Sequence, residues 1–262
     1  MEIIVCIKQV PETTDVGWDP TKGTLIREGV PGILNPNDKN AIEAALQIKE
    51  RYGGLVTAVS MGPPRTEEAL REALSMGMDK AVLLSDSRFA GADTLATAYT
   101  LSLALKRMAG FDLVLCGKES ADGMTGHIGP QLAEFLNLPQ LTYATKIEID
   151  GGSVRIRQKL DEGYRILESP LPVLITVERE INQPRIPPMD EILKAYQEKE
   201  VLSWGAEELG CDEIHLGLKG SPTQTRRVFI QKMEKGRVHF LEGEGSEIAQ
   251  KFVQVLKEKG MI

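Results

Sequence analysis

The chain has 262 residues, of which 42% are hydrophobic, and it carries a formal net charge of −7. That length suffices for one large α/β domain with an appendage or for two small domains, and the apolar content excludes wholesale disorder. The acidic balance, with no long basic patch, argues against nucleic acid as the main partner.

The opening residues and the cysteines indicate a reducing, aqueous compartment. The sequence MEIIVCIKQVPE enters a strand-like run directly, without the pattern of a signal peptide. No apolar run approaches the roughly 18 residues that a membrane helix needs. Cys6, Cys116 and Cys211 form no Cys-x-x-Cys pair, and the histidines are too far apart in sequence to suggest a metal site. We therefore expect a cytoplasmic protein with no metal and no membrane insertion.

The first 140 residues alternate β-rich runs with amphipathic helical stretches. Short apolar runs predict buried parallel strands at residues 3–7, 55–59, 81–84 and 113–116. We expect a helix after each of them: one capped by Asp38 and ended by Gly53, one opening at Thr66, one capped by Asp93 or Thr94, and one through Leu132. This alternation predicts a doubly wound, mostly parallel α/β sheet.

The pattern changes near residue 141. Four further β-rich runs are expected to add antiparallel strands to the sheet, at residues 142–149, 153–159, 164–167 and 173–177. After Ile181 the sequence becomes proline-rich (INQPRIPPMD), and beyond it a helix is expected at residues 246–259. We therefore predict an α/β domain at residues 1–189 and an extended C-terminal arm at residues 190–262. The arm has too little periodic apolar sequence for its own core, so it should pack on this domain or on a partner chain.

Ligands of open parallel sheets bind beyond the carboxyl ends of the strands. Four loops should meet there: residues 8–11 with Asn35 nearby, residues 61–64, residues 89–94 (FAGADT) and residues 117–129 (GKESADGMTGHIG). The glycines of the last loop let the backbone approach a ligand closely, and the helix start that follows offers free N–H groups and a positive dipole end. With Thr125 as a hydroxyl donor, this loop suits a phosphate or pyrophosphate. A turn that binds nothing is the alternative.

The loop at residues 89–94 has similar chemistry. Gly91 and Ala92 permit close approach, and Asp93 or Thr94 stands where a helix starts. A helix cap is one role for this loop, and a second phosphate-facing loop is the sharper hypothesis. No catalytic constellation follows from the sequence, because it lacks a Ser-His-Asp order with a nucleophile elbow. Any chemistry is therefore expected to be a cofactor's.

These segments, taken in order, resemble the beta-subunit family of the electron transfer flavoproteins over essentially the whole chain. The matching motifs are IIVCIKQVP, GTLIREGVPGILNPNDKNAIEAALQIKE, VSMGPP, EALSMGMDKAVLLSD, CGKESADG, SPLPVLITVEREINQPR and GLKGSPTQTRRV. The resemblance implies an adenine nucleotide alpha-hydrolase-like fold and a heterodimer with a larger alpha subunit, which carries an electron-transferring FAD at the interface. It also implies AMP or a second FAD in the crevice of the beta chain, and electron shuttling between acyl-CoA-type or other flavin dehydrogenases and their acceptors.

The resemblance also assigns site residues by position. The implied pocket includes Cys6, Asn35, Asp38 and Met61, together with the loop residues Gly117, Lys118, Glu119, Ser120, Ala121, Asp122, Gly123, Met124, Thr125, Gly126, His127 and Ile128. The loop at residues 89–94 adds Gly91, Ala92, Asp93 and Thr94 to this prediction. Ile181 falls where the family has the apolar anchor, usually leucine, that engages partner dehydrogenases. The C-terminal arm is expected to pack on the alpha subunit.

Two subfamilies differ in the glycine-rich loop. The AMP-binding type ends it with Asn-Gln-Thr. The second type couples NADH oxidation to paired high- and low-potential reductions, a process called flavin-based electron bifurcation. Its loop reads Asp-Gly-Asp-Thr-Ala-Gln-Val-Gly-Pro, and it favours the FAGADT loop. This chain reads DGMTGHIGP from Asp122 and has that loop, so it is closer to the second type, although Met124 and His127 depart from both. We therefore expect FAD in the beta crevice, AMP as the alternative, and NADH as a further partner if the chain bifurcates.

The family's strand signature is also altered at two positions. Gln158 stands where a basic residue is usual, and Arg165 stands where an acid or amide is usual.

Two other classes share parts of this pattern. A universal-stress-type adenine-nucleotide-binding module has the same expected fold, but a compact sensor has no use for the PRIPP segment and the long tail. An adenylating enzyme of the alpha-hydrolase type would have an S-G-G-x-D-S-like loop after the first strand, where this chain has KQVP from Lys8. The electron carrier is therefore the leading hypothesis.

Overall fold

The computed structural model describes residues 1–262 except 13–17, 20–23, 26–30, 109, 224–237 and 239. The chain divides into two compact units, Met1–Arg226 and Arg227–Ile262. The predicted arm begins at residue 190, so its first part, up to Arg226, belongs to the first unit. Residues 224–237 and 239 of the arm lie outside the described residues. The packing of the arm on an alpha subunit stays a prediction.

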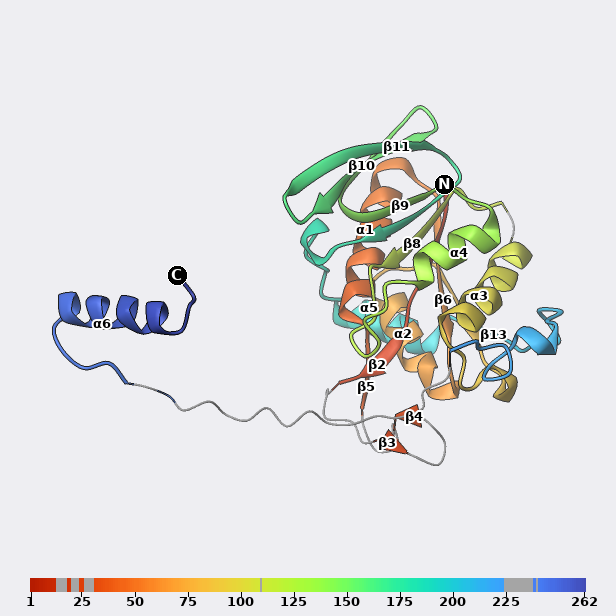
Figure 1. Ribbon diagram of the computed structural model, residues 1–262. Helices are drawn as coiled ribbons and strands as arrows, with labels where there is room; N and C mark the ends of the chain where they lie inside the picture. Colours follow the sequence, from red (N-terminus) through yellow and green to blue (C-terminus); the bar gives the residue numbers. More distant parts are fainter. Residues whose placement is uncertain (13–17, 20–23, 26–30, 109, 224–237, 239) are drawn as a thin grey trace. The chain divides into compact units, whose positions relative to one another are not determined.

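A nine-stranded sheet organises the first unit, in the order β11-β10-β9-β12-β8-β1-β6-β7-β13 (Figure 1). Its strands are β1 (Glu2–Cys6), β6 (Leu55–Met61), β7 (Lys80–Leu84), β8 (Leu113–Gly117), β9 (Gln140–Asp150), β10 (Ser153–Leu160), β11 (Gly163–Pro170), β12 (Val173–Val177) and β13 (Val201–Trp204). β10 runs antiparallel to β9 and β11, and the other neighbouring strands of this sheet run parallel.

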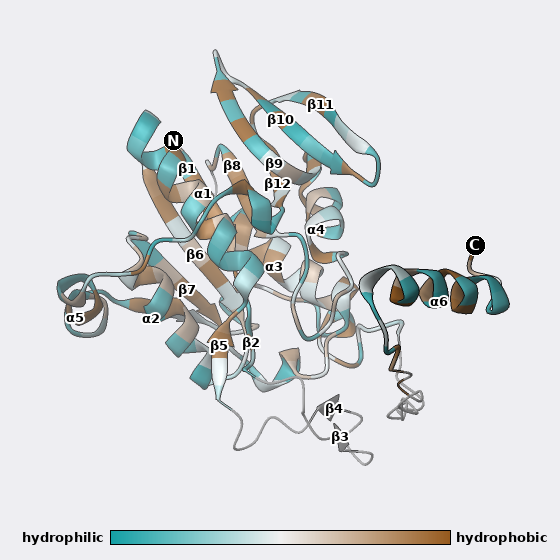
Figure 2. Cartoon of the chain, turned by 90° about the vertical axis from the view of Figure 1, so that its left-hand side faces the viewer, coloured by the Kyte–Doolittle hydropathy of each residue, from teal (hydrophilic) through white to brown (hydrophobic). Residues whose placement is uncertain are grey.

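Helices cover both faces of this sheet. They are α1 (Pro36–Tyr52), α2 (Glu67–Ser75), α3 (Thr94–Met108), α4 (Ile128–Leu136) and α5 (Met189–Gln197). Successive residues of β1 enter different cores: Ile3 and Val5 pack with residues of α1 and α2, whereas Ile4 and Cys6 pack with residues of α3 and α4. Strands buried on both faces have nearly continuous apolar sequence, which is why the runs were recognisable, and Figure 2 shows the central strands β6 and β7 coloured largely as hydrophobic. The predicted fold class is confirmed.

Shorter elements complete the described chain. Two small two-stranded sheets pair β2 (Gln9–Pro11) with β5 (Gly32–Leu34) and β3 (Trp18–Asp19) with β4 (Thr24–Leu25). Single 3-10 turns are η1 (Pro64–Thr66), η2 (Ser87–Phe89), η3 (Arg179–Ile181) and η4 (Glu213–His215). The second unit contains α6 (Gly245–Glu258), which confirms the helix predicted there. None of the helices in the described part of the chain has the length and hydropathy that crossing a bilayer demands.

Two local predictions were wrong. The run at residues 173–177 is not an added antiparallel strand, because β12 lies between β8 and β9 and runs parallel to both. Asp38 does not cap a helix, because α1 already begins at Pro36 after Asn35, and the Asp38 carboxylate accepts backbone N–H groups from two other loops. Proline is favoured in the first helical turn, and that signal should have moved the predicted start two residues earlier.

Candidate nucleotide-binding site

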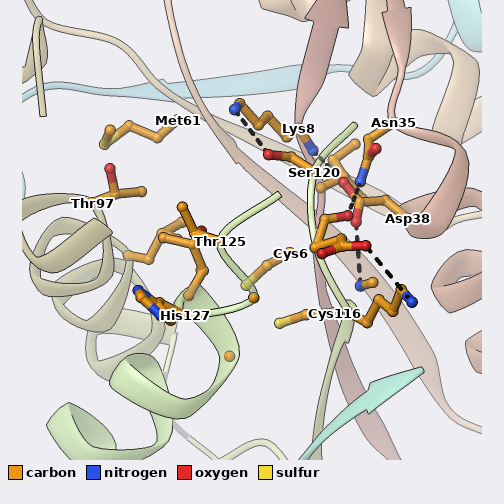
Figure 3. A pocket seen from close by; sticks show the side chains of 18 residues that line it. Cys6, Lys8, Asn35, Asp38, Met61, Thr97, Cys116, Ser120, Thr125 and His127 are labelled. Atoms are coloured by element: carbon orange, nitrogen blue, oxygen red, sulfur yellow. Dashed lines mark hydrogen bonds and ion pairs between the residues drawn. The ribbon is translucent and has the colours of Figure 1, made fainter. Parts of the chain in front are cut away.

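A pocket lies where the chain passes from the carboxyl ends of β1, β6 and β8 into the loops that follow (Figure 3). It has about 610 Å³ of empty space, part of it open to solvent. Of the predicted site residues, the structure brings these together in its lining: Cys6, Asn35, Asp38, Met61, Gly117, Lys118, Glu119, Ser120, Thr125, Gly126, His127 and Ile128.

Asn35 fastens the glycine-rich loop to the start of α1. Its side-chain Nδ2 donates to the Glu119 carbonyl at 3.0 Å, and its Oδ1 accepts the Ala121 N–H at 3.1 Å. Asn37 Nδ2 donates to the same Glu119 carbonyl at 2.7 Å. Asn35 is 1% exposed, so these bonds form away from competing water. A buried side-chain amide that satisfies both a donor and an acceptor of one loop fixes the path of that loop.

Asp38 joins the same helix to two strand ends. Its carboxylate accepts the Lys8 N–H at 2.8 Å and the Gly117 N–H at 3.2 Å. Burial raises the pKa of the Asp38 carboxyl to about 7, although the Asn35 side chain, these two N–H groups and the Lys8 charge favour the ionised form. The pocket therefore has an acid at its base that titrates near neutral pH.

Small residues make this close contact possible. A Cβ atom at Gly117 would lie 2.4 Å from Asp38 Oδ1, and one at Gly129 would lie 2.4 Å from the γ-methyl group of Thr176. Both distances are far below van der Waals contact, so glycine alone fits at either position without rearrangement. Gly129 is the second residue of α4, and the residue before this helix, His127, makes no side-chain capping hydrogen bond. An uncapped helix start that faces a pocket is suited to an anion.

Cations and thiols supply the remaining chemistry of the pocket. Lys8 Nζ is 2.6 Å from Asp122 Oδ1 and 3.2 Å from Ser120 Oγ, which fixes the tip of the glycine-rich loop over β1.

Cys6 and Cys116 are register partners on β1 and β8, and both line the pocket (Figure 3). The hydrogen bond with Cys6 and burial raise the pKa of the Cys116 thiol well above its usual value. Both cysteines therefore act as small apolar groups in the pocket wall.

The rest of the glycine-rich loop lies away from the lining of the pocket. Ala121, Asp122, Gly123 and Met124 form its tip, and Met124 is 68% exposed with φ +46°. Gly123 and Met124 are exposed, and none of these four residues lines the cavity.

The loop at residues 89–94 also lies outside the lining of the pocket. Asp93 caps α3, since its Oδ1 accepts the N–H groups of Leu95 and Ala96 at 3.0 and 3.1 Å. Its Oδ2 accepts the Thr223 N–H, and its own N–H donates to Ser221 Oγ.

The other residues of this loop also contact the segment around residue 218. A Cβ atom at Gly91 would lie 3.2 Å from Leu218 Cβ, while Ala92 and Thr94 complete the turn into α3. The helix-start groups of this loop are thus occupied by the chain itself. Their part in nucleotide binding stays a prediction.

Helix α3 instead contributes two residues that the sequence prediction missed. Thr97 and Leu101 line the pocket beside Met61. They follow Thr94 at intervals of three and four residues, so they share one face of the helix, and this helical spacing was a usable signal.

Ile181 is partly buried, and it packs against the core under α1. The segment after it is held along α1. Asn40 Nδ2 donates to the Asn182 carbonyl at 3.0 Å, and Arg185 Nε donates to Glu43 Oε2 at 2.7 Å. Beyond this anchored stretch Ile186 is 91% exposed. Ile181 is thus only partly exposed, and the docking role that the family resemblance implies for it stays a prediction.

An open parallel sheet with a pocket beyond its carboxyl ends, shaped by a glycine-rich loop and a helix start, is the arrangement of nucleotide-binding α/β proteins. Comparison with known proteins narrows this class. Residues 22–207 match the family described as "Electron transfer flavoprotein domain". The chain is 47% identical over 262 residues to "Electron transfer flavoprotein subunit beta" of Clostridium acetobutylicum, with 100% of both chains covered. It is 48% identical over 262 residues to the protein of the same description from Thermoanaerobacterium thermosaccharolyticum, again with 100% of both covered.

A third relative, "Caffeyl-CoA reductase-Etf complex subunit CarD" of Acetobacterium woodii, is 43% identical over 263 residues with 100% of both chains covered. The chain therefore belongs to the electron transfer flavoprotein family, and the first two of these relatives are described as beta subunits. The predicted resemblance is confirmed.

Proposed function

We propose that this chain is the beta subunit of a heterodimeric electron transfer flavoprotein and that its pocket holds an adenine nucleotide. The observation that carries the proposal is the glycine-rich loop fixed by Asn35 beside the uncapped start of α4. In this arrangement the backbone N–H groups at the helix start receive the phosphate, and Gly126 and Gly129 let it approach closely. The apolar wall formed by Cys6, Cys116 and Leu101 suits the flat face of a ring system.

FAD is the proposed occupant, with AMP as the alternative. The loop that begins at Asp122 and the FAGADT loop both resemble the FAD-holding subfamily, and a pocket of about 610 Å³ that is open to solvent leaves room for the ligand to extend outward. The N–H groups of Leu95 and Ala96 are already bound by Asp93, so phosphate binding is assigned to the α4 side alone. When bound, a flavin accepts and donates electrons singly or in pairs, and the residues of this chain hold it and exclude water from it.

The alpha subunit is the proposed partner of the C-terminal arm. Helix α6 has apolar side chains at Ile248, Phe252 and Val255, spaced by four and three residues, and no residue of this helix is buried. Phe252 is 53% exposed. An amphipathic helix whose apolar face is not buried among the described residues is stabilised by packing on another surface.

Electron exchange with a dehydrogenase is proposed to use the segment after Ile181. Because Ile181 is packed into the core, the exposed apolar side chains Ile186 and Met189 are better placed as docking contacts; Met189 is 71% exposed. Pro184 and Pro187 flank Ile186, and Pro188 precedes Met189, so the backbone here loses little entropy on binding. The partner is expected to be an acyl-CoA-type or other flavin dehydrogenase, and NADH is the proposed electron donor if the complex bifurcates.

The test is the nucleotide content of the complex. The chain is co-expressed with the alpha subunit encoded beside it, and the purified complex is denatured to release nucleotides for identification by mass spectrometry. A yellow heterodimer with FAD or AMP in addition to the alpha-subunit flavin supports the proposal. A colourless homodimer that binds ATP contradicts it and favours the universal-stress-type module instead.

A further inference from the structure

Tyr143 has a backbone conformation that residues other than glycine rarely adopt. Its φ is +56° within strand β9, and a bulky side chain at such an angle is a genuine outlier. The pairing of β9 with β12 shifts between Ile175 and Val177, so that Thr142 and Tyr143 together face Thr176. This is a β-bulge, a feature that re-aims side chains next to functional sites. Strain of this kind persists only where the surroundings impose it.

Hydrogen bonds from two neighbouring strands impose this conformation. The Tyr143 N–H donates to Thr176 Oγ1 at 3.0 Å, from β12. From β10, Gln158 Nε2 donates at 2.9 Å to both the carbonyl and the hydroxyl oxygen of Thr142. Gln158 is 4% exposed, and its own Oε1 accepts a hydrogen bond from Arg165 Nε on β11. The two positions that depart from the family's strand signature are therefore cross-strand partners, and their joint effect is to hold the bulge.

The bulge lies against the second half of the glycine-rich loop. A Cβ atom at Gly126 would be 3.8 Å from the Tyr143 hydroxyl oxygen, and Gly126 itself has φ +65° and lines the pocket. Thr176, which holds the Tyr143 N–H, also touches the other end of this stretch at Gly129, where a Cβ would meet its methyl group at 2.4 Å. The Tyr143 hydroxyl thus lies near one end of residues 126–129, and Thr176 packs against the other end; these residues line the pocket where α4 begins.

We propose that Tyr143 is a positioning residue that holds residues 126–129 in their pocket-lining conformation and thereby sets the affinity for the nucleotide. This inference rests on the proposed function, because the affinity in question is that for an adenine nucleotide. It has a distinctive consequence. Relaxing the bulge removes strain from the fold but frees the loop, so stability and nucleotide affinity change in different directions.

Three variants of Tyr143 test this in the complex with the alpha subunit. Tyr143→Gly removes both the ring and the strain, Tyr143→Ala removes the ring alone, and Tyr143→Phe keeps the ring. We expect Tyr143→Gly to melt at or above the temperature of Tyr143→Ala, and both to bind FAD at least tenfold more weakly than the wild type. Tyr143→Phe lacks the hydroxyl that lies nearest Gly126 but keeps the ring, so it should bind FAD more weakly than the wild type and more tightly than Tyr143→Ala. Tyr164→Ala, at an aromatic side chain 65% exposed on β11, is the matched control and should leave FAD affinity unchanged.

Amide hydrogen exchange of nucleotide-free protein gives a readout that does not depend on binding. The first hydrogen-bonded amide of α4, the Gln131 N–H that donates to the His127 carbonyl at 3.0 Å, should exchange faster in Tyr143→Gly than in the wild type. If exchange there is unchanged, or if Tyr143→Gly and Tyr143→Ala bind FAD as tightly as the wild type, the positioning role is overturned. A wild-type complex that binds no adenine nucleotide in this pocket would refute the proposed function, and the exchange comparison would still decide whether Tyr143 holds the loop.

Discussion

Replacing Asn35 by alanine should detach the glycine-rich loop while leaving the start of α1 in place. The Asn35 side chain makes no capping hydrogen bond, so the helix does not depend on it. The Glu119 carbonyl keeps its 2.7 Å bond from Asn37, but the Ala121 N–H loses its partner. Leaving such a group unsatisfied costs about 1–3 kcal/mol, and since Ala121 is only partly buried we take about 1–2 kcal/mol. That corresponds to roughly 5- to 30-fold weaker nucleotide binding.

Asn40→Ala is the matched control. Asn40 is a second buried amide on α1, but its Nδ2 donates to the Arg179 carbonyl and to Asn182, not to the glycine-rich loop. Both variants should lower the free energy of unfolding by about 1–2 kcal/mol in urea titrations. Only Asn35→Ala should raise the dissociation constant for FAD, measured by calorimetry on nucleotide-depleted complex. Equal affinities in the two variants would refute the reasoning that the loop is the nucleotide-binding element.

Three further predictions concern the pocket base, the close contacts and the docking segment. Because the Asp38 pKa is raised from 3.8 to about 7 in the folded chain, its protonation stabilises the fold at low pH, and this contribution is lost as the pH rises through 7. The stability advantage of the wild type over Asp38→Asn in urea titrations should therefore shrink between pH 5 and pH 8. A constant difference would be evidence against a raised pKa. Gly117→Ala should lower the free energy of unfolding by about 1–3 kcal/mol, because its Cβ would lie 2.4 Å from Asp38. Gly123→Ala should lower it by less than about 1 kcal/mol, because its Cβ would approach only a serine hydroxyl at 3.1 Å. Similar melting curves would contradict the packing argument. Ile181→Asp should lower the melting temperature because the residue packs on the core. Ile186→Asp should leave stability and flavin content unchanged but should slow electron delivery to the partner dehydrogenase in stopped-flow assays. An unaltered rate would remove Ile186 from the docking surface.

The four strand–helix units could be predicted because each is encoded locally. A buried parallel strand is a short apolar run, and each helix that follows has its own periodicity. The position of a strand within a sheet is not encoded in this way. The run at residues 173–177 has the same composition whether it runs parallel or antiparallel, so the place of β12 between β8 and β9 could not be derived from it. The edge strand β13 has only four residues, too few for a period to be recognised.

The site was predictable where position along a strand determines it. Loops at the carboxyl ends of parallel strands must meet, and this placed Asn35, Met61 and the glycine-rich loop correctly around one pocket. The prediction was weaker where a distant segment intervenes. Residues 217–223 occupy the hydrogen-bonding groups of the FAGADT loop, and neither sequence segment predicts that contact. The bulge at Tyr143 likewise depends on bonds from three strands, and neither its φ nor its neighbours can be derived from local sequence.

The most direct test of the account is the nucleotide stoichiometry of the purified heterodimer after FAD supplementation. Nucleotides released on denaturation are identified and counted against protein concentration, for the wild type and for Asn35→Ala. The account predicts two FAD per heterodimer in the wild type, and in Asn35→Ala a second FAD that dissociates roughly 5- to 30-fold more readily while the alpha-subunit flavin remains. One FAD with one AMP, before and after supplementation, would contradict FAD as the occupant of this pocket. One FAD and no second nucleotide would contradict the nucleotide-binding role itself.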